Sequence, residues 1–164
     1  MRVVAALDFD DWYAAQRPRV YLAMLALSGD ADLAADVTDE AFTRAVANWN
    51  RVSAMESPGG WVQRVALNVA RRRLRRGRTE RRLLRTIGGP SDVSPPTGEI
   101  WDLVRELPER QRVAVVLRYV ADLTEPEIAI AMDIARGTVA STLAAARERL
   151  AGVLVEEEIE EDVQ

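Results

Sequence analysis

Residues 60–85 read GWVQRVALNVARRRLRRGRTERRLLR, and this stretch decides how the rest of the chain is interpreted. In its first half apolar residues recur every three to four positions. This spacing predicts a helix whose buried face is made of Trp61, Val62, Val65, Ala66 and Val69, with Leu74 further on. The second half carries nine Arg against a single acidic residue, Glu80. A core-facing helix that continues into a strip of guanidinium groups is suited to holding a polyanion.

A solvated helix end is the simpler interpretation of this Arg strip. Like charges at helical spacing repel one another, however, and so many Arg with almost no acidic neighbour would not favour an unliganded helix. We therefore expect nucleic-acid contact. Trp49 and Trp61 are expected to anchor the core rather than to stack on bases.

The composition limits the chemistry that this chain can perform. Its 164 residues allow one ordinary domain or two small helical ones. It contains no Cys, no His and no Lys, so thiol nucleophiles, imidazole bases and most zinc sites are excluded. We expect no enzyme, no catalytic residues, no cofactor and no metal site. No apolar run is long enough to cross a bilayer, so we expect a cytoplasmic protein without membrane insertion.

The net charge of −4 conceals a strong asymmetry along the chain. Residues 1–87 carry 15 Arg and 10 acidic residues, for a net charge of +5. Residues 99–164 carry 7 Arg and 15 acidic residues, for a net charge of −8. This charge asymmetry indicates that one half of the chain binds a polyanion and that the other half has another role.

The first half of the chain predicts three helices. Asp8 caps the first, which we expect to kink or restart at Pro18 and to stop at Gly29. Asp30 or Asp32 caps the second, whose apolar face is formed by Leu33, Val37, Ala41, Ala45 and Trp49. Residues 50–56 are expected to form a loop. Ser57 and Pro58 then begin the helix described above.

The second half predicts a helix-turn-helix. A helix over 100–107 ends at Pro108, and a second follows over 109–121. Thr124 and Glu127 form a capping box that starts a short helix, residues 133–135 form a tight turn, and a last helix covers 137–154. The core of the helix-turn-helix is expected at 124–143. We see no strand-like alternation of useful length, so the fold class is all-α.

Composition divides the chain into four segments. Residues 1–87 form the first helical domain, and the Gly- and Pro-rich residues 88–98 form a linker. Residues 99–154 form the second domain, and residues 155–164 form an acidic tail. The tail is either a solubilising end or a DNA mimic that folds back on the Arg strip.

The order of these features resembles the ECF (extracytoplasmic function) sigma factors, a class of bacterial RNA polymerase sigma factor, over about residues 9–154. Residues 36–45, DVTDEAFTRA, resemble the polymerase-binding segment of the family. Residues 60–70, GWVQRVALNVA, are similar to its promoter −10 helix. The segments LPERQR at 107–112, LRY at 117–119, EIA at 127–129, GTV at 137–139 and ARERL at 146–150 are similar to its −35 module.

The resemblance implies a fold of two small helical domains and roles for particular residues. The partners that it implies are core RNA polymerase, promoter DNA and an anti-sigma factor. The residues implied to bind polymerase are Asp36, Asp39, Glu40, Phe42 and Arg44. The residues implied to bind the −10 element are Arg64, Asn68, Arg71, Arg72, Arg75 and Arg76, with the loop over 51–57 holding a flipped-out base. The residues implied to face the −35 element are Arg136, Thr138, Ser141, Thr142 and Arg147.

The chain departs from the family pattern at three places. Asp39 replaces a Gln of the polymerase segment, and Asp133 stands where the helix-turn-helix has a Gly. The recognition helix reads VASTLAAAR over 139–147, where the family has VKSRLxRAR, so cations are missing. Each lost phosphate contact weakens DNA affinity. A sigma-like regulator or adaptor that no longer reads a −35 element therefore remains an alternative to a working sigma factor. A helical carboxylate enzyme has almost no support.

Overall fold

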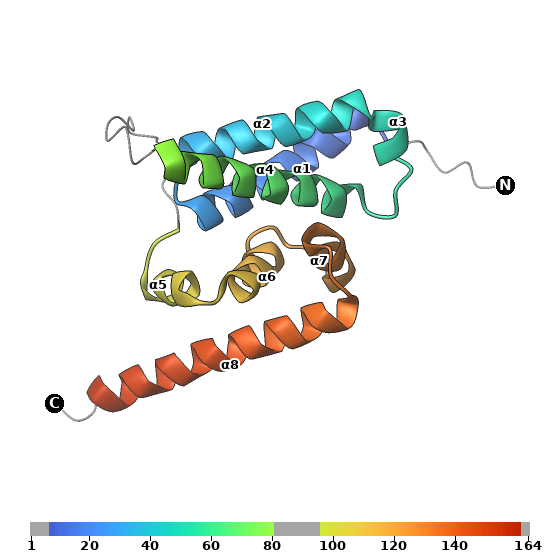
Figure 1. Cartoon of the computed structure of the whole chain (residues 1–164). Coiled ribbons are helices and arrows are strands. Elements are labelled where there is room, and N and C mark those ends of the chain that lie inside the picture. Colours follow the sequence, from blue (N-terminus) through green and yellow to red (C-terminus); the bar gives the residue numbers. More distant parts are fainter. Residues whose placement is uncertain (1–6, 81–95, 162–164) are drawn as a thin grey trace.

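The computed structural model describes residues 7–80 and 96–161, and over these residues it consists of helices without strands (Figure 1). The helices fall into a first module over 7–80 and a second module over 96–161. Their bounds are α1 Phe9–Ser28, α2 Ala31–Ala47, α3 Trp49–Val52, α4 Pro58–Glu80, α5 Glu99–Glu106, α6 Glu109–Tyr119, α7 Glu125–Met132 and α8 Arg136–Glu161. The predicted all-α fold class is confirmed.

The first module is a bundle of α1, α2 and α4, with the short α3 at one end (Figure 1). Its three long helices bury small and branched apolar side chains such as Val20, Val37 and Val62. Aromatic rings close one end of the bundle: Trp12 lies 4.9 Å from Trp49 and 5.3 Å from Phe42, measured between ring centroids. Trp49 and Trp61 both pack against the core, as expected.

Local signals set most helix ends in this module. Asp8 accepts hydrogen bonds from the backbone N–H groups of Asp10 and Asp11, and Asp30 accepts one from Leu33. Gly29 ends α1 with φ of 67°, a left-handed conformation that glycine adopts without strain. The Ser57 hydroxyl accepts from the N–H of Gly60 at 2.9 Å and caps α4.

Three expectations for this module were wrong in whole or in part. The helix α1 runs from Phe9 to Ser28 without a break, so of the expected kink or restart at Pro18 the restart does not occur; residues buried on both sides of Pro18, including Trp12 and Val20, hold both halves in one bundle. Trp49 belongs to the separate turn α3 and not to α2, so the expected loop over 50–56 begins only after Val52. Leu74 is 37% exposed because it lies beyond the part of α4 that the core covers.

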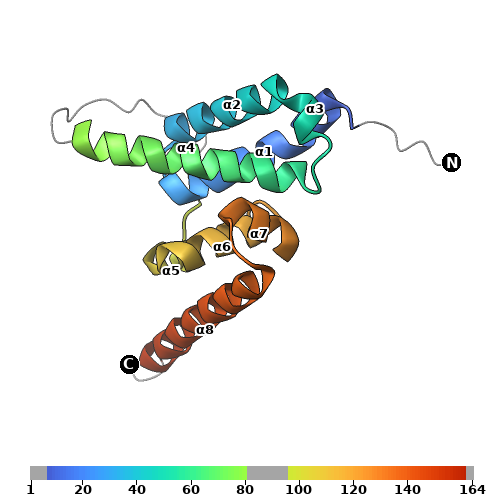
Figure 2. The same cartoon turned by 45° about the vertical axis from the view of Figure 1, so that its right-hand side comes forward.

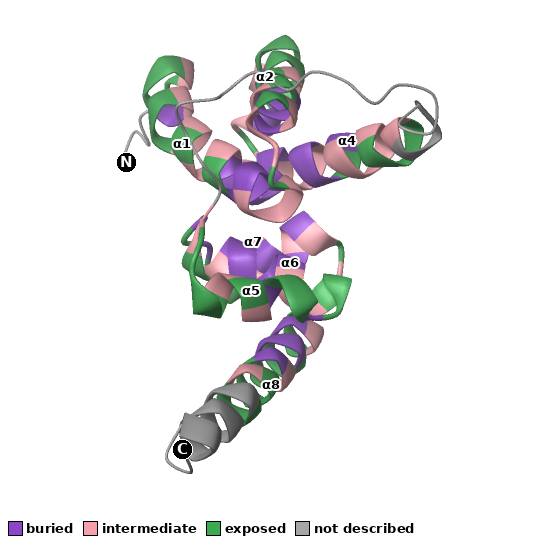
Figure 3. Ribbon diagram, turned by 90° about the vertical axis from the view of Figure 1, so that its left-hand side faces the viewer, coloured by how far each residue is buried: buried purple, intermediate pink, exposed green. Residues whose placement is uncertain are grey.

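The second module packs α5, α6, α7 and α8 around apolar side chains such as Leu117, Ile128 and Leu143 (Figure 3). The predicted capping box is present: the backbone N–H of Thr124 donates to the carboxylate of Glu127 at 2.7 Å. Asp133 ends α7 with φ of 57°, and α8 begins three residues later. The helix α7, the turn and α8 make the predicted helix-turn-helix.

Two predicted boundaries in this module shift. The helix α6 ends at Tyr119 rather than at 121, because the chain turns there and Asp122 adopts φ of 53°. The helix α8 continues to Glu161 rather than ending at 154, so part of the predicted acidic tail is helical. Most of the predicted linker, together with Arg81, Arg82 and Arg85, lies outside the described residues.

The two modules pack against each other mainly through α7 and the start of α4 (Figure 2). The backbones meet at Gly60. A Cβ atom there would lie 2.9 Å from the hydroxyl oxygen of Ser57, 3.0 Å from the carbonyl oxygen of Glu127 and 3.2 Å from the Cβ of Ile130. Glycine is therefore favoured at position 60 by the close approach of α7 and of the Ser57 cap, and not by its own backbone conformation.

Within the described residues, no single helix combines the length and the apolar character needed to cross a membrane. Only α7 and residues 136–152 of α8 taken together reach that length and apolar character, and these two helices are bent by 101° relative to each other.

Replacing Gly60 with Ala is expected to destabilise the protein, because the added methyl group presses on the backbone of α7. Overpacking of this kind costs about 1–3 kcal/mol. Gly77→Ala on the same helix is the matched control, since nothing lies within 4 Å of a Cβ atom at position 77. We expect Gly77→Ala to stabilise the protein by about 0.5–1 kcal/mol. Thermal unfolding of both variants measures the difference, and equal shifts would contradict the close contact.

Candidate nucleic-acid interface

The helix α4 carries the predicted −10 residues on two stripes. Asn68, Arg72 and Arg76 follow one another at four-residue spacing, and Asn68 and Arg76 are exposed. Arg64 and Arg71 lie on a second stripe together with Gly60 and Leu67. The opposite face of α4 is anchored by the buried Val62, Ala66 and Val69. Burial of that face fixes which way both stripes point.

The exposed stripe is joined to α2 by a network of charges around Glu40. The carboxylate of Glu40 accepts hydrogen bonds from Arg44 at 2.5 Å, from Arg72 at 2.9 Å and from Arg73 at 2.8 Å. Arg73 also donates to Asp36 at 3.1 Å. The hydrogen bond from Arg73 holds the pKa of Glu40 below its ordinary value, and the charge of Arg44 adds to this effect.

This network joins residues that sequence reasoning had assigned to two different partners. Asp36, Glu40 and Arg44 belong to the predicted polymerase set, whereas Arg72 belongs to the predicted DNA set. Asp39 is exposed and accepts a hydrogen bond from Arg17 at 3.2 Å. Part of the positive charge of the Arg strip is therefore balanced inside the first module.

Phe42 of the predicted polymerase set lies in the core and not on the surface. It is 4% exposed, and its ring centroid lies 5.0 Å from that of Tyr13. Phe42 therefore packs on the buried side of α2. The charged members of the predicted polymerase set lie on the exposed side of this helix.

The predicted −35 residues lie at the start of α8 and along it. Arg136, Ser141 and Arg147 are exposed, whereas Thr138 is half-buried. Thr142 is 8% exposed, and its hydroxyl donates to the carbonyl of Thr138 at 2.6 Å, so it is turned toward its own helix. The guanidinium of Arg147 donates to the hydroxyl of Tyr119 at 2.9 Å.

Ion pairs connect the two predicted DNA-binding sets across the module boundary. Arg64 pairs with Asp133 at 2.9 Å, and Arg71 pairs with Glu109 at 3.2 Å. In the opposite direction, Arg136 of the second module pairs with Glu56 of the first at 3.6 Å. From the sequence, Asp133 stood out only as a departure from a glycine pattern, and no local signal pointed to Glu56 or Glu109.

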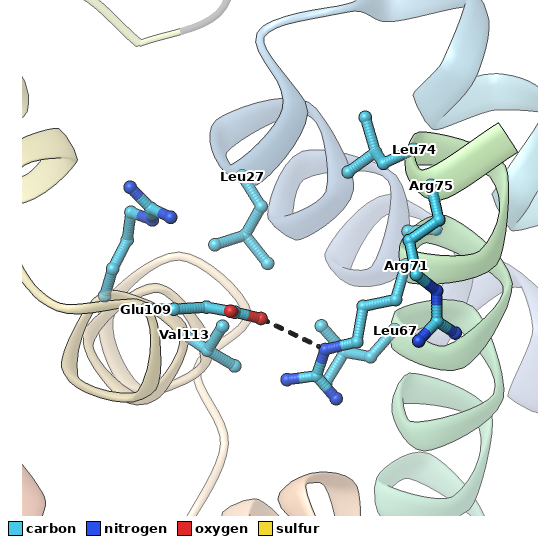
Figure 4. A pocket seen from close by; sticks show the side chains of 9 residues that line it. Leu27, Leu67, Arg71, Leu74, Arg75, Glu109 and Val113 are labelled. Atoms are coloured by element: carbon cyan, nitrogen blue, oxygen red, sulfur yellow. Dashed lines mark hydrogen bonds and ion pairs between the residues drawn. The ribbon is translucent and has the colours of Figure 1, made fainter. Parts of the chain in front are cut away.

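A cavity lies farther along the same boundary, between α1, α4 and α6 (Figure 4). It is lined by Leu27, Leu67, Leu74 and Val113, with Arg71 and Arg75 at its rim. The side chains of Arg71 and Glu109 meet across it (Figure 4). The boundary between the modules is thus tight at Gly60 and incompletely filled toward the C-terminal end of α4.

Family models match both modules in order along the chain. The model for Sigma-70 region 2 matches residues 12–80, and the model for Sigma-70, region 4 matches residues 97–150. The chain belongs to the sigma-70 family. The two matches cover α4 with its Arg strip and the helix-turn-helix of α7 and α8, respectively.

Similar curated proteins assign the chain to the ECF class of sigma factors. It is 25% identical to the ECF RNA polymerase sigma factor SigW of Bacillus subtilis, over 89% of this chain and 87% of that protein. It is 24% identical to the RNA polymerase sigma-E factor of Streptomyces coelicolor, over 94% of this chain and 90% of that protein.

Solved structures share the fold. The sigma factor RpoE in complex with the anti-sigma factor NepR, from Bartonella quintana, matches with a TM-score of 0.71 at 21% identity, over 90% of this chain and 96% of that one. CnrH in complex with the cytosolic domain of CnrY matches with a TM-score of 0.62 at 18% identity, over 90% of this chain and 88% of that one.

Replacing Glu40 with Gln is expected to lower the free energy of unfolding near pH 7 by about 1 kcal/mol, the net value of a typical hydrogen bond. The pKa of Glu40 is lowered in the folded state, so its stabilisation is complete above the unfolded pKa and is lost as pH falls through the folded pKa. The difference between wild type and variant should therefore shrink below about pH 4.

Denaturant unfolding at several pH values measures this difference. Glu106→Gln is the control, because it changes the net charge equally on an exposed site of α5 and leaves the network of α2 and α4 intact. A difference between wild type and Glu40→Gln that stays constant down to pH 3 would contradict the role of the carboxylate.

Proposed function

We propose that this ECF sigma factor binds core RNA polymerase and directs promoter-specific transcription initiation by recognising −10 and −35 elements. It performs no catalysis of its own and works in the cytoplasm. One observation carries the proposal: within the residues that match Sigma-70 region 2, a single helix presents an exposed Asn68 followed by Arg72 and Arg76 at helical spacing. This arrangement combines one group that can read a base edge with cations that hold phosphates.

In the proposed −10 site, Asn68 reads a base that has left the helical stack. Extruding a base costs a few kcal/mol, and stacking together with hydrogen bonds to its edge offsets this cost. The side-chain amide of Asn68 offers both a donor and an acceptor for such an edge. Arg72 and Arg76 are proposed to contact the phosphates of the DNA backbone without reading its sequence. Residues 51–57, which comprise the end of α3 and the loop that leads into α4, are proposed to hold the extruded base.

In the proposed polymerase site, the exposed charges of α2 face the partner. Asp36, Asp39 and Arg44 are exposed on this helix, and the partly exposed Glu40 lies among them. Phe42 contributes indirectly, because its burial against Tyr13 fixes the orientation of α2. Glu40 and Asp36 of α2 are hydrogen-bonded to Arg72 and Arg73 of α4, so polymerase and DNA would approach the first module from adjoining sides.

The recognition helix is proposed to contribute less to DNA affinity, through the −35 element, than α4 contributes. The recognition helix offers Arg136, Ser141 and Arg147 at its surface, and the small residues Ala140 and Ala144 lie between them. Few cations remain to neutralise phosphates, so the affinity and its salt dependence should come mainly from α4. A sigma-like adaptor without −35 recognition is the less favoured alternative, because the matches place a region 4 over 97–150.

An anti-sigma factor is proposed as a further partner of this chain. The structurally similar sigma factor RpoE was captured with the anti-sigma factor NepR. The present chain covers nearly the whole length of that protein with the same fold, which supports the proposal.

Run-off transcription with purified core RNA polymerase tests the proposed function. The chain should yield promoter-specific transcripts from genomic fragments that it enriches in a chromatin map. Core polymerase alone is the control. Specific binding to polymerase without any promoter-specific transcript would replace the proposal with the adaptor alternative.

Asn68→Ala and Arg76→Ala are expected to separate base reading from phosphate contact. Asn68→Ala should reduce the preference for the −10 strand over a scrambled strand by roughly tenfold or more, because a good base contact contributes about 1–3 kcal/mol of discrimination. Arg76→Ala should weaken binding to both strands equally and reduce the salt slope by about 1. Titration of the two labelled strands at several salt concentrations measures both quantities. Uniform weakening by Asn68→Ala would show that it does not read a base.

A further inference from the structure

We infer that the cavity between α1, α4 and α6 is a binding site for a small amphipathic carboxylate of the medium-chain fatty acid class. The cavity has an apolar interior and an excess of guanidinium groups at its rim. An acyl chain would fill the interior, and the carboxylate at its end would accept hydrogen bonds from the rim. This site goes beyond the proposed function, because neither polymerase nor promoter DNA is needed to fill it.

The size of the cavity suits a small ligand. Its volume is about 370 Å³, which falls within the range of roughly 300–1,000 Å³ that ligand pockets occupy. The side chains around it do not fill the space between the three helices. An apolar body placed there would remove their surface from water, and this transfer is favourable.

The interior is built from aliphatic side chains of all three helices. Leu27 comes from α1, Leu67 and Leu74 come from α4, and Val113 comes from α6. Figure 4 shows Leu27, Leu67 and Val113 around one common space. The lining residue Ala70 is too small to fill the α4 side of this space. Leu74 is large and apolar but remains 37% exposed, so an acyl chain would also cover surface that the fold leaves in water.

The rim carries more positive than negative charge. Arg71, Arg75 and Arg112 line it against one acidic residue, Glu109, which leaves a formal charge of +2. Among the described residues, Arg71 donates its Nε–H to Glu109 at 3.2 Å. Arg112 donates from Nη1 to the backbone carbonyl of Arg105 at 2.7 Å. A guanidinium group has five N–H donors, so Arg71 and Arg112 both retain donors for a carboxylate.

The two parts of the cavity together select the class of ligand. A neutral apolar molecule would leave the charge of the rim without a partner in the ligand. A small inorganic anion would leave the apolar interior in contact with water. A guanidinium group matches a carboxylate through two parallel hydrogen bonds. A molecule with one carboxylate and an apolar body therefore satisfies the interior and the rim at once.

Ligand binding would have a consequence for DNA. Arg71 and Arg75 belong to the proposed −10 set, and a bound carboxylate would compete with DNA phosphates for their guanidinium groups. This consequence rests on the proposed function, whereas the binding of the carboxylate does not.

Titration of the full-length chain with octanoate, without DNA, tests the inference. Octanol has the same chain without the charge, and acetate has the charge without the chain. Calorimetry should show that octanoate binds roughly tenfold more tightly than either control or better, because only octanoate engages both the interior and the rim. In methyl NMR spectra the signals of Leu27, Leu67 and Val113 should shift. Those of Leu22, an exposed residue of α1 outside the cavity lining, should not.

Charge variants on both sides of the rim should change octanoate affinity in opposite directions. Arg112→Gln should weaken binding by roughly three- to tenfold, the effect of losing a charge-assisted hydrogen bond. Glu109→Gln should strengthen it, because the variant removes a like charge and releases the Nε–H of Arg71. Arg110→Gln and Glu106→Gln are the matched controls, since they make the same charge changes at exposed positions outside the cavity lining. Both controls should bind octanoate as the parent does.

Filling the interior supplies an independent result. Ala70→Leu should lower octanoate affinity by roughly tenfold, because the larger side chain takes the place of part of the acyl chain. Thermal unfolding of this variant verifies that it is folded. Equal binding of octanoate and octanol would overturn the inference, as would equal effects of Arg112→Gln and Arg110→Gln.

Binding of the −10 strand in the presence of octanoate tests the consequence for DNA. Octanoate should weaken strand binding by the parent chain more than by Arg112→Gln at the same concentration, and acetate should have no such effect. Octanoate binding that leaves DNA affinity unchanged would overturn the proposed competition. Failure of run-off transcription would refute the proposed function and leave the calorimetric result standing.

Discussion

The structure depends on the way in which α4 is fixed in the first module. Val62, Ala66 and Val69 anchor one side of this helix in the core, and that single constraint directs its two remaining stripes. One stripe, with Asn68 and Arg76, faces solvent. The other, with Gly60, faces α7, and a Cβ atom at position 60 would lie only 3.0 Å from the carbonyl oxygen of Glu127. One helix thus serves as core element, proposed DNA reader and docking surface for the second module.

Charge links these three roles. An Arg strip of this density repels itself, and the structure relieves the repulsion with carboxylates from two sources. Glu40 and Asp36 on α2 balance Arg72 and Arg73 from within the first module. Asp133 and Glu109 balance Arg64 and Arg71 from the second. The opposite net charges of the two halves of the chain therefore attract the two modules to each other, and they also bear on the partners proposed for each half.

Much of the fold could be predicted because the relevant signals are local. The capping box of Thr124 and Glu127, the serine cap before Pro58 and the stop at Gly29 all act within a few residues. Predictions failed where packing overrode local preference. Packing on both sides of Pro18 keeps α1 continuous, and a break after α2 puts Trp49 into α3. Phe42 could not be placed from its motif, because a helix pattern does not say which partner helix covers a given residue.

The sequence by itself determined the helical class, the helix-turn-helix, the apolar face of α4 and the position of Asn68 and the Arg strip. These follow from periodicity, capping and composition, which are properties of neighbouring residues. Only the tertiary structure decided which Arg side chains are covered, that Glu56, Glu109 and Asp133 are their partners, and that Gly60 is needed for contact between modules. The physical reason is that these contacts join residues far apart in the chain, and their geometry exists only where the two modules pack against each other.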